Sequence, residues 1–311
     1  MPSVLTITLN PAVDKSFTVE RLEPDHKLRC PNPQVDAGGG GINVARGIKR
    51  LGGDVNAFVV TGGHNGSRLR EMLVTEGIET SGLEVSGETR ESIMIIDSSV
   101  NRQYRIIAEG PNIKPDESEA VLDAIRTIDP FPSYVVASGS LPAGLPEDYY
   151  ARIASLVKSK GSRFILDTGG MPLQKALSAG LFLVKPNLRE LSMLSGKEEL
   201  QLDEVDDAAM QLIRTGHCEI VVVSLGAAGA MYVNRHGYRH FPAPQVKRKS
   251  TVGAGDSMVA GMVWALQKGL DADEMVRFGI ACGTAATLQP GTQLFQVADV
   301  ERLYRWLVRQ S

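Results

Sequence analysis

The 311-residue chain lacks the cysteine and histidine patterns of a disulfide-rich or zinc-binding protein. Its three cysteines, Cys30, Cys218 and Cys282, are odd in number and far apart, which fits neither a disulfide framework nor a zinc site. None of its five histidines stands in a nucleophile or metal-binding pattern. We therefore expect a protein of a reducing compartment, the cytoplasm.

Long hydrophobic runs and a strong net charge are also missing. The longest apolar runs, such as residues 4–9 and 220–223, are far too short to span a bilayer. The first residues lack the basic and long apolar regions of a signal peptide. A net charge of −3 provides no electrostatic reason to bind nucleic acid or an anionic membrane, so we expect neither partner.

The chain does contain ample apolar sequence, arranged in alternating strand-like and helix-like segments. Hydrophobic residues make up 43% of it and charged residues 22%, which is enough for a large buried core. From residue 115 onward, helix-like segments alternate regularly with short apolar segments. Repeated β-then-α units predict an α/β fold with a mainly parallel sheet and helices on both faces. Because no linker or repeat interrupts the chain, we expect one domain over residues 1–311.

A strand-rich part of the chain departs from this alternation. Residues 92–97 and 103–107 alternate apolar and polar side chains on either side of a turn, which is typical of an antiparallel hairpin. With the strand-like residues 17–19 and 34–36, this hairpin predicts a small β-sheet that projects from the main domain. We expect this sheet to act as a lid, formed by segments of about 15–37 and 90–108.

Residues 250–258 (STVGAGDSM) combine a glycine turn, an acid and the start of an apolar helix. Gly253 and Gly255 leave backbone N–H groups uncovered, and the first turn of a helix attracts anions. An acid at Asp256 would repel a phosphate unless it faces a hydroxyl that must lose its proton. That arrangement suits phosphoryl transfer. The pattern alone also fits an ordinary helix N-terminus with an acid in its first turn.

Polar residues follow several predicted strands. Ligands bind beyond the carboxyl ends of the strands in sheets of this kind. The residues concerned are Asn10 and Asp14, Ser138 to Ser140, Asp167, Lys185 to Asn187, and Ser224 to Gly226. Each could be an ordinary loop residue, but five such strand ends together favour a binding site.

A second glycine run, residues 38–41, precedes a predicted helix that contains Asn43 in its first turn. It could be a flexible loop, but it better suits close approach of the backbone to a polyhydroxylated ligand. It is not a dinucleotide fingerprint, because no G-x-G-x-x-G directly follows the first strand.

Two further pairs of residues could bind ligands. Asn187 and Glu190 lie three apart at a helix start, where they form either a simple cap or a hard-oxygen site for Mg²⁺ held partly through water. On its own the cap is the simpler interpretation. Arg90 and Arg105 flank the predicted hairpin, and two guanidinium groups facing a cleft could clamp a sugar phosphate.

With these motifs in order, the chain resembles the PfkB-type sugar kinases of the ribokinase superfamily over nearly its whole length. Six motifs carry the resemblance: residues 8–11 (TLNP) with Asp14, 38–46 (GGGGINVAR), 138–142 (SGSLP), 184–190 (VKPNLRE), 223–229 (VSLGAAG) and 250–258. The resemblance implies a ribokinase-like fold with a β-sheet lid and ATP as co-substrate. It also implies a homodimer through paired lids, because an exposed lid sheet must cover its edges and apolar face.

The resemblance further implies a role for each matching residue. Asp256 would deprotonate the C1 hydroxyl of the sugar, and the N–H groups of Gly253, Ala254 and Gly255 would stabilise the transferring phosphoryl group. The sugar would be held by Asp14, Gly39, Gly40, Asn43 and Ser140, with its existing phosphate on Arg90 and Arg105. ATP would contact Lys185, Asn187, Ser224, Gly226, Gly229 and Thr251. Mg²⁺ would be ordered through water by Asn187 and Glu190, and K⁺ would lie near Ser250, Val252, Ala286, Gln289 and Gly291.

The sugar itself is suggested by one position. Similar kinases act on fructose 6-phosphate, fructose 1-phosphate or tagatose 6-phosphate, and those for the last two tend to carry a lysine where this chain has Gly40. The glycine favours fructose 6-phosphate, converted to fructose 1,6-bisphosphate, with the other two hexose phosphates as alternatives. Arg90 and Arg105 count against a kinase for nucleosides or unphosphorylated sugars. The presence of Asp256 counts against a non-catalytic sensor.

Overall fold

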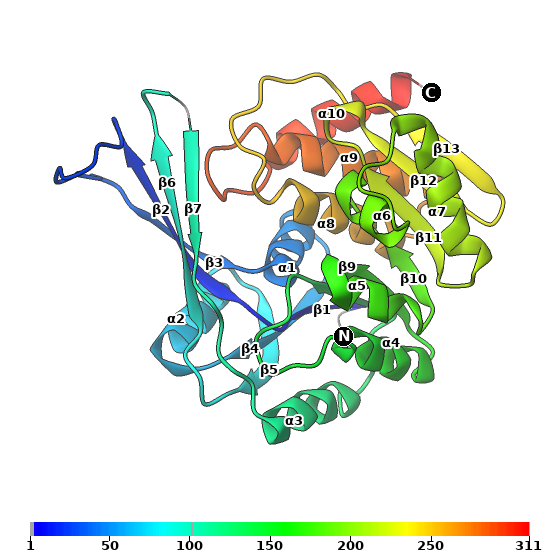
Figure 1. Ribbon diagram of the computed structural model, residues 1–311, viewed down its shortest axis with the longest axis horizontal. Helices are drawn as coiled ribbons and strands as arrows, with labels where there is room; N and C mark the ends of the chain where they lie inside the picture. Colours follow the sequence, from blue (N-terminus) through cyan, green and yellow to red (C-terminus); the bar gives the residue numbers. More distant parts are fainter. Residues whose placement is uncertain (1–2, 101, 311) are drawn as a thin grey trace.

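The computed structural model describes residues 3–100 and 102–310, in which the chain builds one large and one small β-sheet (Figure 1). The large sheet has the strand order β13 (Gly237–Phe241), β12 (Ala230–Asn234), β11 (Cys218–Ser224), β10 (Leu181–Val184), β9 (Arg163–Asp167), β8 (Tyr134–Ser138), β1 (Val4–Thr8), β4 (Val55–Thr61), β5 (Glu79–Glu84). From β11 to β5 every neighbouring pair is parallel. Strands β12 and β13 add an antiparallel edge. The predicted, mainly parallel sheet is therefore confirmed.

Helices cover both faces of the large sheet because its strands are apolar on both sides. In β1 all five residues are buried, and Val4 packs into one core while Leu5 and Ile7 pack into the other. The first core is closed by α1 (Gly40–Arg50), α2 (Gly63–Thr75), α8 (Ala254–Gln267), α9 (Ala272–Ala286) and α10 (Val297–Arg309). The second is closed by α3 (Pro115–Arg126), α4 (Tyr149–Ser159), α5 (Gly170–Leu177), α6 (Leu188–Leu194) and α7 (Val205–Arg214).

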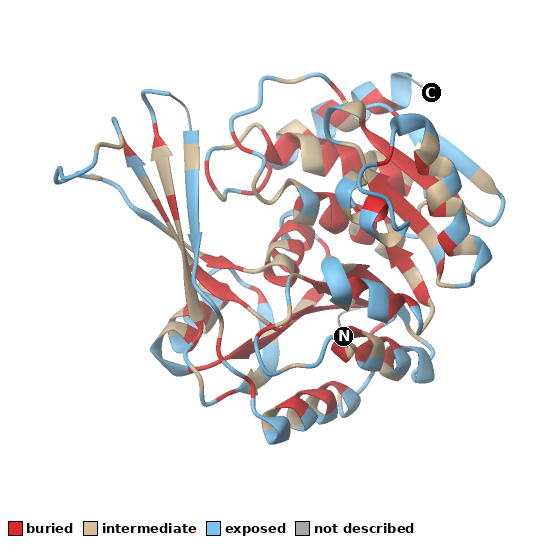
Figure 2. Cartoon of the chain, viewed as in Figure 1, coloured by how far each residue is buried: buried red, intermediate tan, exposed pale blue. Residues whose placement is uncertain are grey.

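The small sheet stands to one side of this layered body (Figure 1, left). Its order is β3 (Gln34–Gly38), β2 (Ala12–Val19), β6 (Arg90–Asp97), β7 (Arg102–Ile107). Strands β6 and β7 form the predicted antiparallel hairpin, whereas β2 and β6 pair in parallel. Residue 101, inside the expected segment 90–108, lies outside the described residues. Figure 2 shows buried residues where β2 and β3 join the body, whereas β7 is mostly exposed along its length.

Three elements differ from what the sequence pattern predicts. Strand β2 begins at Ala12, ahead of the strand-like residues 17–19, so Asp14 lies within a strand and not in a loop. Strand β5 was not predicted, because most of its residues are exposed at a sheet edge and no apolar alternation marks it. The apolar spacing predicts a helix only over residues 68–75 after a turn at Gly62 and Gly63, but α2 already begins at Gly63. The Glu88 carboxylate accepts hydrogen bonds from the N–H groups of His64 and Asn65, which stabilises this earlier start.

No helix in the described part of the chain is long and apolar enough to cross a membrane.

Candidate active site

The two glycine turns of the sequence meet at the carboxyl-end edge of the large sheet. Asp256 lies in the first turn of α8, and Gly253, with a φ of 73° that needs glycine, precedes the helix. Asn43 lies in the first turn of α1. Its Nδ2 donates a hydrogen bond of 2.8 Å to Asp256 Oδ2. The fold thus joins two residues that are 213 positions apart in sequence.

The surroundings of Asp256 make its carboxylate unusually basic. Burial, with a further contribution from the Asp167 carboxylate, raises the pKa of Asp256 to about 6. Hydrogen bonds from Asn43 and Ser138 and the charge of Lys185 limit the rise. The side chain therefore remains mostly ionised at neutral pH, yet accepts a proton more readily than an exposed aspartate. These are the properties that a general base requires.

A buried ion pair lies beside Asp256. Lys185, only 5% exposed, places its Nζ 3.1 Å from Asp167 Oδ1. Burial alone would lower the pKa of Lys185, but Asp167, Glu190 and Asp256 together raise it, so the ammonium group stays charged. The sequence marked Asp167 only as a strand-end residue and missed its contact with Lys185. The position after β9 was the available signal.

Asp256 and Asp167 face one cavity of about 510 Å³ at the ends of β8 and β9. It is lined by Ser138 to Leu141, Asp167 to Gly169, Pro172, Glu190 and Asp256. Three carboxylates therefore border the same space, and Lys185 lies next to it.

The turn at 38–41 is tightly packed against the end of β8. A Cβ atom built on Gly40 would lie 2.2 Å from Ser138 Oγ and 2.9 Å from the Gly139 nitrogen. One on Gly41 would lie 2.4 Å from the Ile7 carbonyl oxygen. In this chain a lysine at position 40 does not fit unless this packing changes.

The residues predicted to hold a phosphorylated sugar also gather on this side. Burial raises the pKa of Asp14, on β2, to about 6, while the charges of Arg90 and Arg105 oppose the rise. Both arginines are therefore close enough to act on Asp14. Arg90 Nη2 donates to the Asn10 carbonyl oxygen at 3.1 Å. Asn10 Nδ2 donates to Ser140 Oγ at 3.3 Å, which links Ser140 to the same group.

Asn187 and Glu190 form a complete capping box at the start of α6. The Asn187 N–H donates to Glu190 Oε2 at 2.8 Å, and the Glu190 N–H donates to Asn187 Oδ1 at 2.9 Å. The predicted cap is thus present, and the role of the pair in ordering Mg²⁺ stays a prediction. Burial also raises the pKa of Glu190, which lines the cavity with Asp256. Within residues 3–100 and 102–310, no group of three or more His, Cys, Asp or Glu could by itself hold a metal ion.

A second cavity, of about 280 Å³, adjoins the turn before α8. Four of the predicted nucleotide-binding residues line it: Ser224, Gly226, Gly229 and Thr251. Gly255 and the apolar side chains Val246, Met258 and Ile280 complete much of its wall. Asn187 bridges to Ser224 through the backbone, and Lys185 lies at the end of β10, so all six predicted residues lie in one region.

The residues proposed for K⁺ lie on two adjoining segments. The Ser250 N–H donates to the Thr287 carbonyl oxygen at 3.4 Å, and the Val252 N–H donates to Ser250 Oγ at 3.2 Å. The Ala286 carbonyl oxygen accepts the Gln289 N–H at 3.0 Å. Gly291 lies farther along, where a Cβ atom would be 3.9 Å from Ser16 Oγ on the small sheet.

Comparison with known proteins assigns this architecture to a family. The model of the pfkB family carbohydrate kinases matches residues 4–298. The chain is 41% identical over 303 residues to the ATP-dependent 6-phosphofructokinase isozyme 2 of Mycobacterium tuberculosis, covering 97% of this chain and 89% of that protein. It is 38% identical to the Escherichia coli protein of the same description, covering 99% and 100%. It is also 33% identical to a 1-phosphofructokinase of Borreliella burgdorferi, covering 96% of each chain.

Solved structures agree with these relationships. The E. coli phosphofructokinase-2 in complex with fructose-6-phosphate superposes with a TM-score of 0.92 at 37% identity, covering 99% of this chain and 100% of that one. Its complex with potassium has a TM-score of 0.94 at 38% identity, with the same coverage. Arabidopsis thaliana ribokinase, at 21% identity and a TM-score of 0.76 over 98% of this chain and 99% of that one, shares the fold. The predicted ribokinase-like fold is therefore confirmed.

Proposed function

The chain belongs to the pfkB family of carbohydrate kinases, and we propose on this basis that it is an ATP-dependent 6-phosphofructokinase. The reaction transfers the terminal phosphoryl group of ATP to the C1 hydroxyl of fructose 6-phosphate. The products are fructose 1,6-bisphosphate and ADP.

One observation carries the proposal: a basic carboxylate stands beside the uncovered N–H groups of a helix start. The C1 oxygen attacks the terminal phosphorus as the Asp256 carboxylate takes its proton. ADP leaves, and the N–H groups of Gly253, Ala254 and Gly255 stabilise charge on the phosphoryl oxygens. The hydrogen bond from Asn43 keeps the Asp256 side chain directed towards the cleft.

Charge and packing at the sugar end favour a phosphorylated hexose. Arg90 and Arg105 act on the same carboxylate, Asp14, so both cations can reach a phosphate bound near it. Gly39, Gly40, Asn43 and Ser140 are assigned to the sugar hydroxyls. Fructose 6-phosphate is preferred because a lysine at position 40, as in kinases for the two alternative hexose phosphates, would displace the Ser138 and Gly139 atoms packed against Gly40.

The nucleotide is assigned to the cavity beside α8, where Ser224, Gly226, Gly229 and Thr251 line the wall. Asn187 bridges to Ser224 of the cavity wall, and a Cβ atom on Gly255 of the same wall would lie 3.6 Å from Lys185 Nζ, so the charged Lys185 suits the phosphate chain. The apolar wall of Met258 and Ile280 suits the flat face of a base.

Mg²⁺ fits the acidic side of the cleft as an ion held largely through water. Glu190 and Asn187 would order it, since hard oxygen donors line this wall and the described protein ligands are too few for a cage of their own. When bound with ATP, Mg²⁺ neutralises part of the phosphate charge. K⁺ is assigned to Ser250, Val252, Ala286, Gln289 and Gly291, with support from the potassium complex of the E. coli relative.

The small sheet is assigned as a lid and as the dimer interface. Tyr104 and Ile106 of β7 are 41% and 58% exposed, and they lie opposite Ile95 and Ile93 of β6 on one face. Such a face is expected to pair with that of a second copy. A tetrameric inhibited form is described for the E. coli relative, so light scattering should test for larger assemblies as well as for a dimer. The cytoplasm remains our expected location.

The experiment that tests the proposal is an acceptor panel with ATP and Mg²⁺. Fructose 6-phosphate, fructose 1-phosphate, tagatose 6-phosphate, ribose and adenosine are compared by kcat/KM, and the product is identified by phosphorus NMR. The highest value is expected for fructose 6-phosphate, with the new phosphate on C1. A higher value for another acceptor would reassign the substrate, and no transfer to any acceptor would favour a non-catalytic sensor.

A further inference from the structure

In the described part of the chain, two side-chain hydrogen bonds join the small sheet to the loops on the nucleotide side of the cleft. Thr292 Oγ1, in the segment between α9 and α10, donates to Asp36 Oδ2 on β3 at 3.1 Å. Ser250 Oγ, ahead of α8, donates to Gln103 Oε1 on β7 at 3.5 Å. The first distance is that of a normal hydrogen bond, and the second is at the outer limit. The contact between Thr292 and Asp36 is therefore the stronger link.

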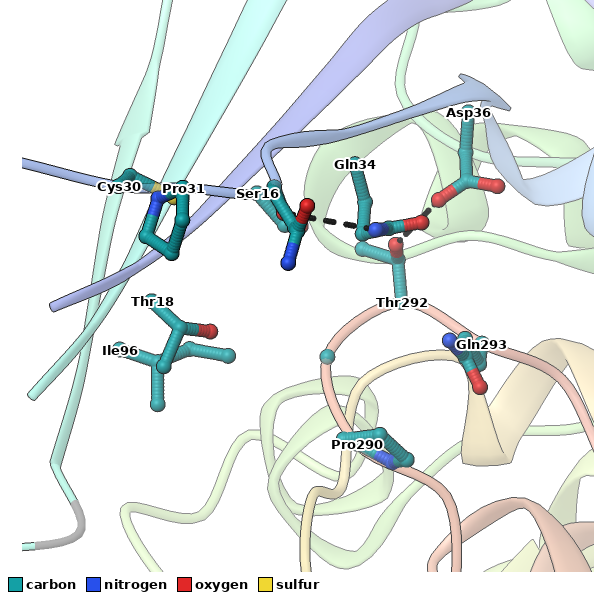
Figure 3. Close-up of a pocket in the computed structure, with 12 residues that line it drawn as sticks. Ser16, Thr18, Cys30, Pro31, Gln34, Asp36, Ile96, Pro290, Thr292 and Gln293 are labelled. Carbon is teal, nitrogen blue, oxygen red and sulfur yellow. Dashed lines mark hydrogen bonds between the residues drawn. The ribbon is translucent and has the colours of Figure 1, made fainter. Parts of the chain in front are cut away.

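Little packing supports this link. A cavity of about 440 Å³ separates the small sheet from the segment that carries Thr292 (Figure 3). In Figure 3 the side chains of Asp36 and Thr292 point toward each other at its edge, joined by a dashed line. Ser16 also lines the cavity, and its buried Oγ has no hydrogen-bond partner among the described residues. Because the two surfaces do not interdigitate here, apolar burial does little to hold the small sheet against the Thr292 segment. The hydrogen bond therefore supplies much of the attraction between them.

The acceptor side of the link is rigidly held. Arg46 of α1 is only 5% exposed, and its guanidinium donates to Asp36 Oδ1 at 3.4 Å and to the Ala37 carbonyl oxygen at 3.3 Å. The same guanidinium donates to Glu76 Oε2 at 2.6 Å. Asp36 is thus anchored to α1 and α2. A force on Asp36 therefore also acts on the part of the small sheet that joins the main body.

Asp36 is also well placed to affect the sugar side of the cleft. It lies directly opposite Asp14 in the pairing of β2 with β3. Strand β3 then runs straight into Gly39 and the start of α1. A shift of Asp36 relative to Thr292 would therefore move the proposed sugar ligands away from the proposed nucleotide site.

We propose that Thr292 is a positioning residue, whose hydrogen bond to Asp36 latches the small sheet over the cleft. The proposal rests on the function proposed above. With the latch closed, the C1 hydroxyl is the acceptor and water is excluded. With it open, a water oxygen forms the new bond to the terminal phosphorus, ADP leaves, and inorganic phosphate and a proton are the products.

A matched pair of variants tests the latch. Thr292→Val keeps the shape but removes the hydroxyl, and Thr292→Ser keeps the hydroxyl. For Thr292→Val we expect KM for fructose 6-phosphate, and the ratio of ATP hydrolysed to sugar phosphorylated, to rise about five- to tenfold, the scale of one lost hydrogen bond of ordinary strength. Thr292→Ser is expected to stay within about twofold of the unmodified enzyme on both measures.

A purely structural role predicts something else. In that case Thr292→Val lowers Tm and reduces sugar phosphorylation and ATP hydrolysis in proportion, and the latch is rejected. An unchanged ratio and KM in Thr292→Val also rejects it.

Hydrogen exchange without substrate gives a readout independent of activity. Amides of β3 and of residues 290–295 should exchange faster in Thr292→Val than in Thr292→Ser. If the unmodified enzyme phosphorylates no acceptor, the proposed function is wrong, and the latch is then tested by the exchange rates alone. Equal exchange rates in Thr292→Val and Thr292→Ser would overturn the latch.

Discussion

The turn at residues 38–41, where α1 begins, and the turn at 253–255, where α8 begins, are both rich in glycine, and both helices start at the cleft. In the first turn, a Cβ atom on Gly40 would meet Ser138 Oγ at 2.2 Å. In the second, the nearest heavy atom to a Cβ on Gly255 is Lys185 Nζ, at 3.6 Å. Glycine is thus needed at 40 because the protein fills the space, whereas the space at 255 is open to the cavity. The same residue type indicates packing in one turn and access for a ligand in the other.

The largest expected effect concerns the acid of the second turn. Asp256→Asn keeps the shape of the side chain but removes the base, so we expect kcat to fall roughly 10²–10⁴-fold while sugar-phosphate binding changes far less. Steady-state kinetics with fructose 6-phosphate, and binding measured by calorimetry, separate the two quantities. A kcat close to that of the unmodified enzyme would show that Asp256 is not the general base.

Protein stability provides the control for Asp256→Asn. The pKa of Asp256 is raised from 3.8 to about 6 in the folded state, so the folded state binds the proton more tightly. Ionisation of Asp256 therefore lowers the free energy of unfolding. This loss grows as pH rises from about 4 to about 6, and it is complete above about 6. At pH 7 the Asn variant should be more stable by about 1–3 kcal/mol. A loss of kcat with lowered stability would instead indicate damage to the fold.

The next effect tests the packed turn. Gly40→Ala introduces a methyl group against Ser138 Oγ and the Gly139 nitrogen. We expect unfolding free energy to fall by about 1–3 kcal/mol, the usual cost of overpacking. Urea denaturation monitored by circular dichroism measures it. An unchanged midpoint would mean that the turn can move away, and position 40 would no longer be closed to a lysine.

The matched substitution in the open turn should behave in the opposite way. Gly255→Ala lies in a helix with free space, so stability should be unchanged or raised by up to about 1 kcal/mol. The methyl group occupies space assigned to the phosphate chain of ATP, and we expect kcat/KM for ATP to fall by about tenfold. If Gly255→Ala loses stability and Gly40→Ala does not, the contrast between the turns is wrong.

The smallest effect distinguishes the two carboxylates by pH. Burial raises the pKa of Asp256 and of Asp14 to about 6, and the proposed function requires each in its ionised form. With sugar bound, kcat should fall by half near pH 6 and then by about tenfold per pH unit, because only the base is lost. The value of kcat/KM should fall more steeply, because Asp14 also loses its charge. A pH profile from 5 to 8 tests this, and equal slopes would argue against a role for Asp14 in binding.

Much of the fold followed from local patterns, because buried parallel strands and covering helices leave regular apolar spacing. The exceptions have physical causes. Strand β5 is mostly exposed at an edge, so it carries no apolar pattern. The start of α2 depends on Glu88, which lies more than twenty residues away from the N–H groups that it caps. Both features depend on partners that are distant in the chain.

The candidate site was predicted only in part. Motif order placed Asp256, Asn43 and Lys185 on one ligand-binding edge. The pairing of Lys185 with Asp167 and the contact between Asp36 and Thr292 have no local signature, since their partners are 18 and 256 residues apart.

By itself, the sequence determined which residue types stand at the strand ends and helix starts, and hence the family and the chemistry available to it. Only the tertiary structure decided which of these groups touch, how basic Asp256 becomes, and why Gly40 must be glycine. The physical reason is that burial, ion pairing and steric exclusion act through space, between atoms that chain folding brings together from distant positions.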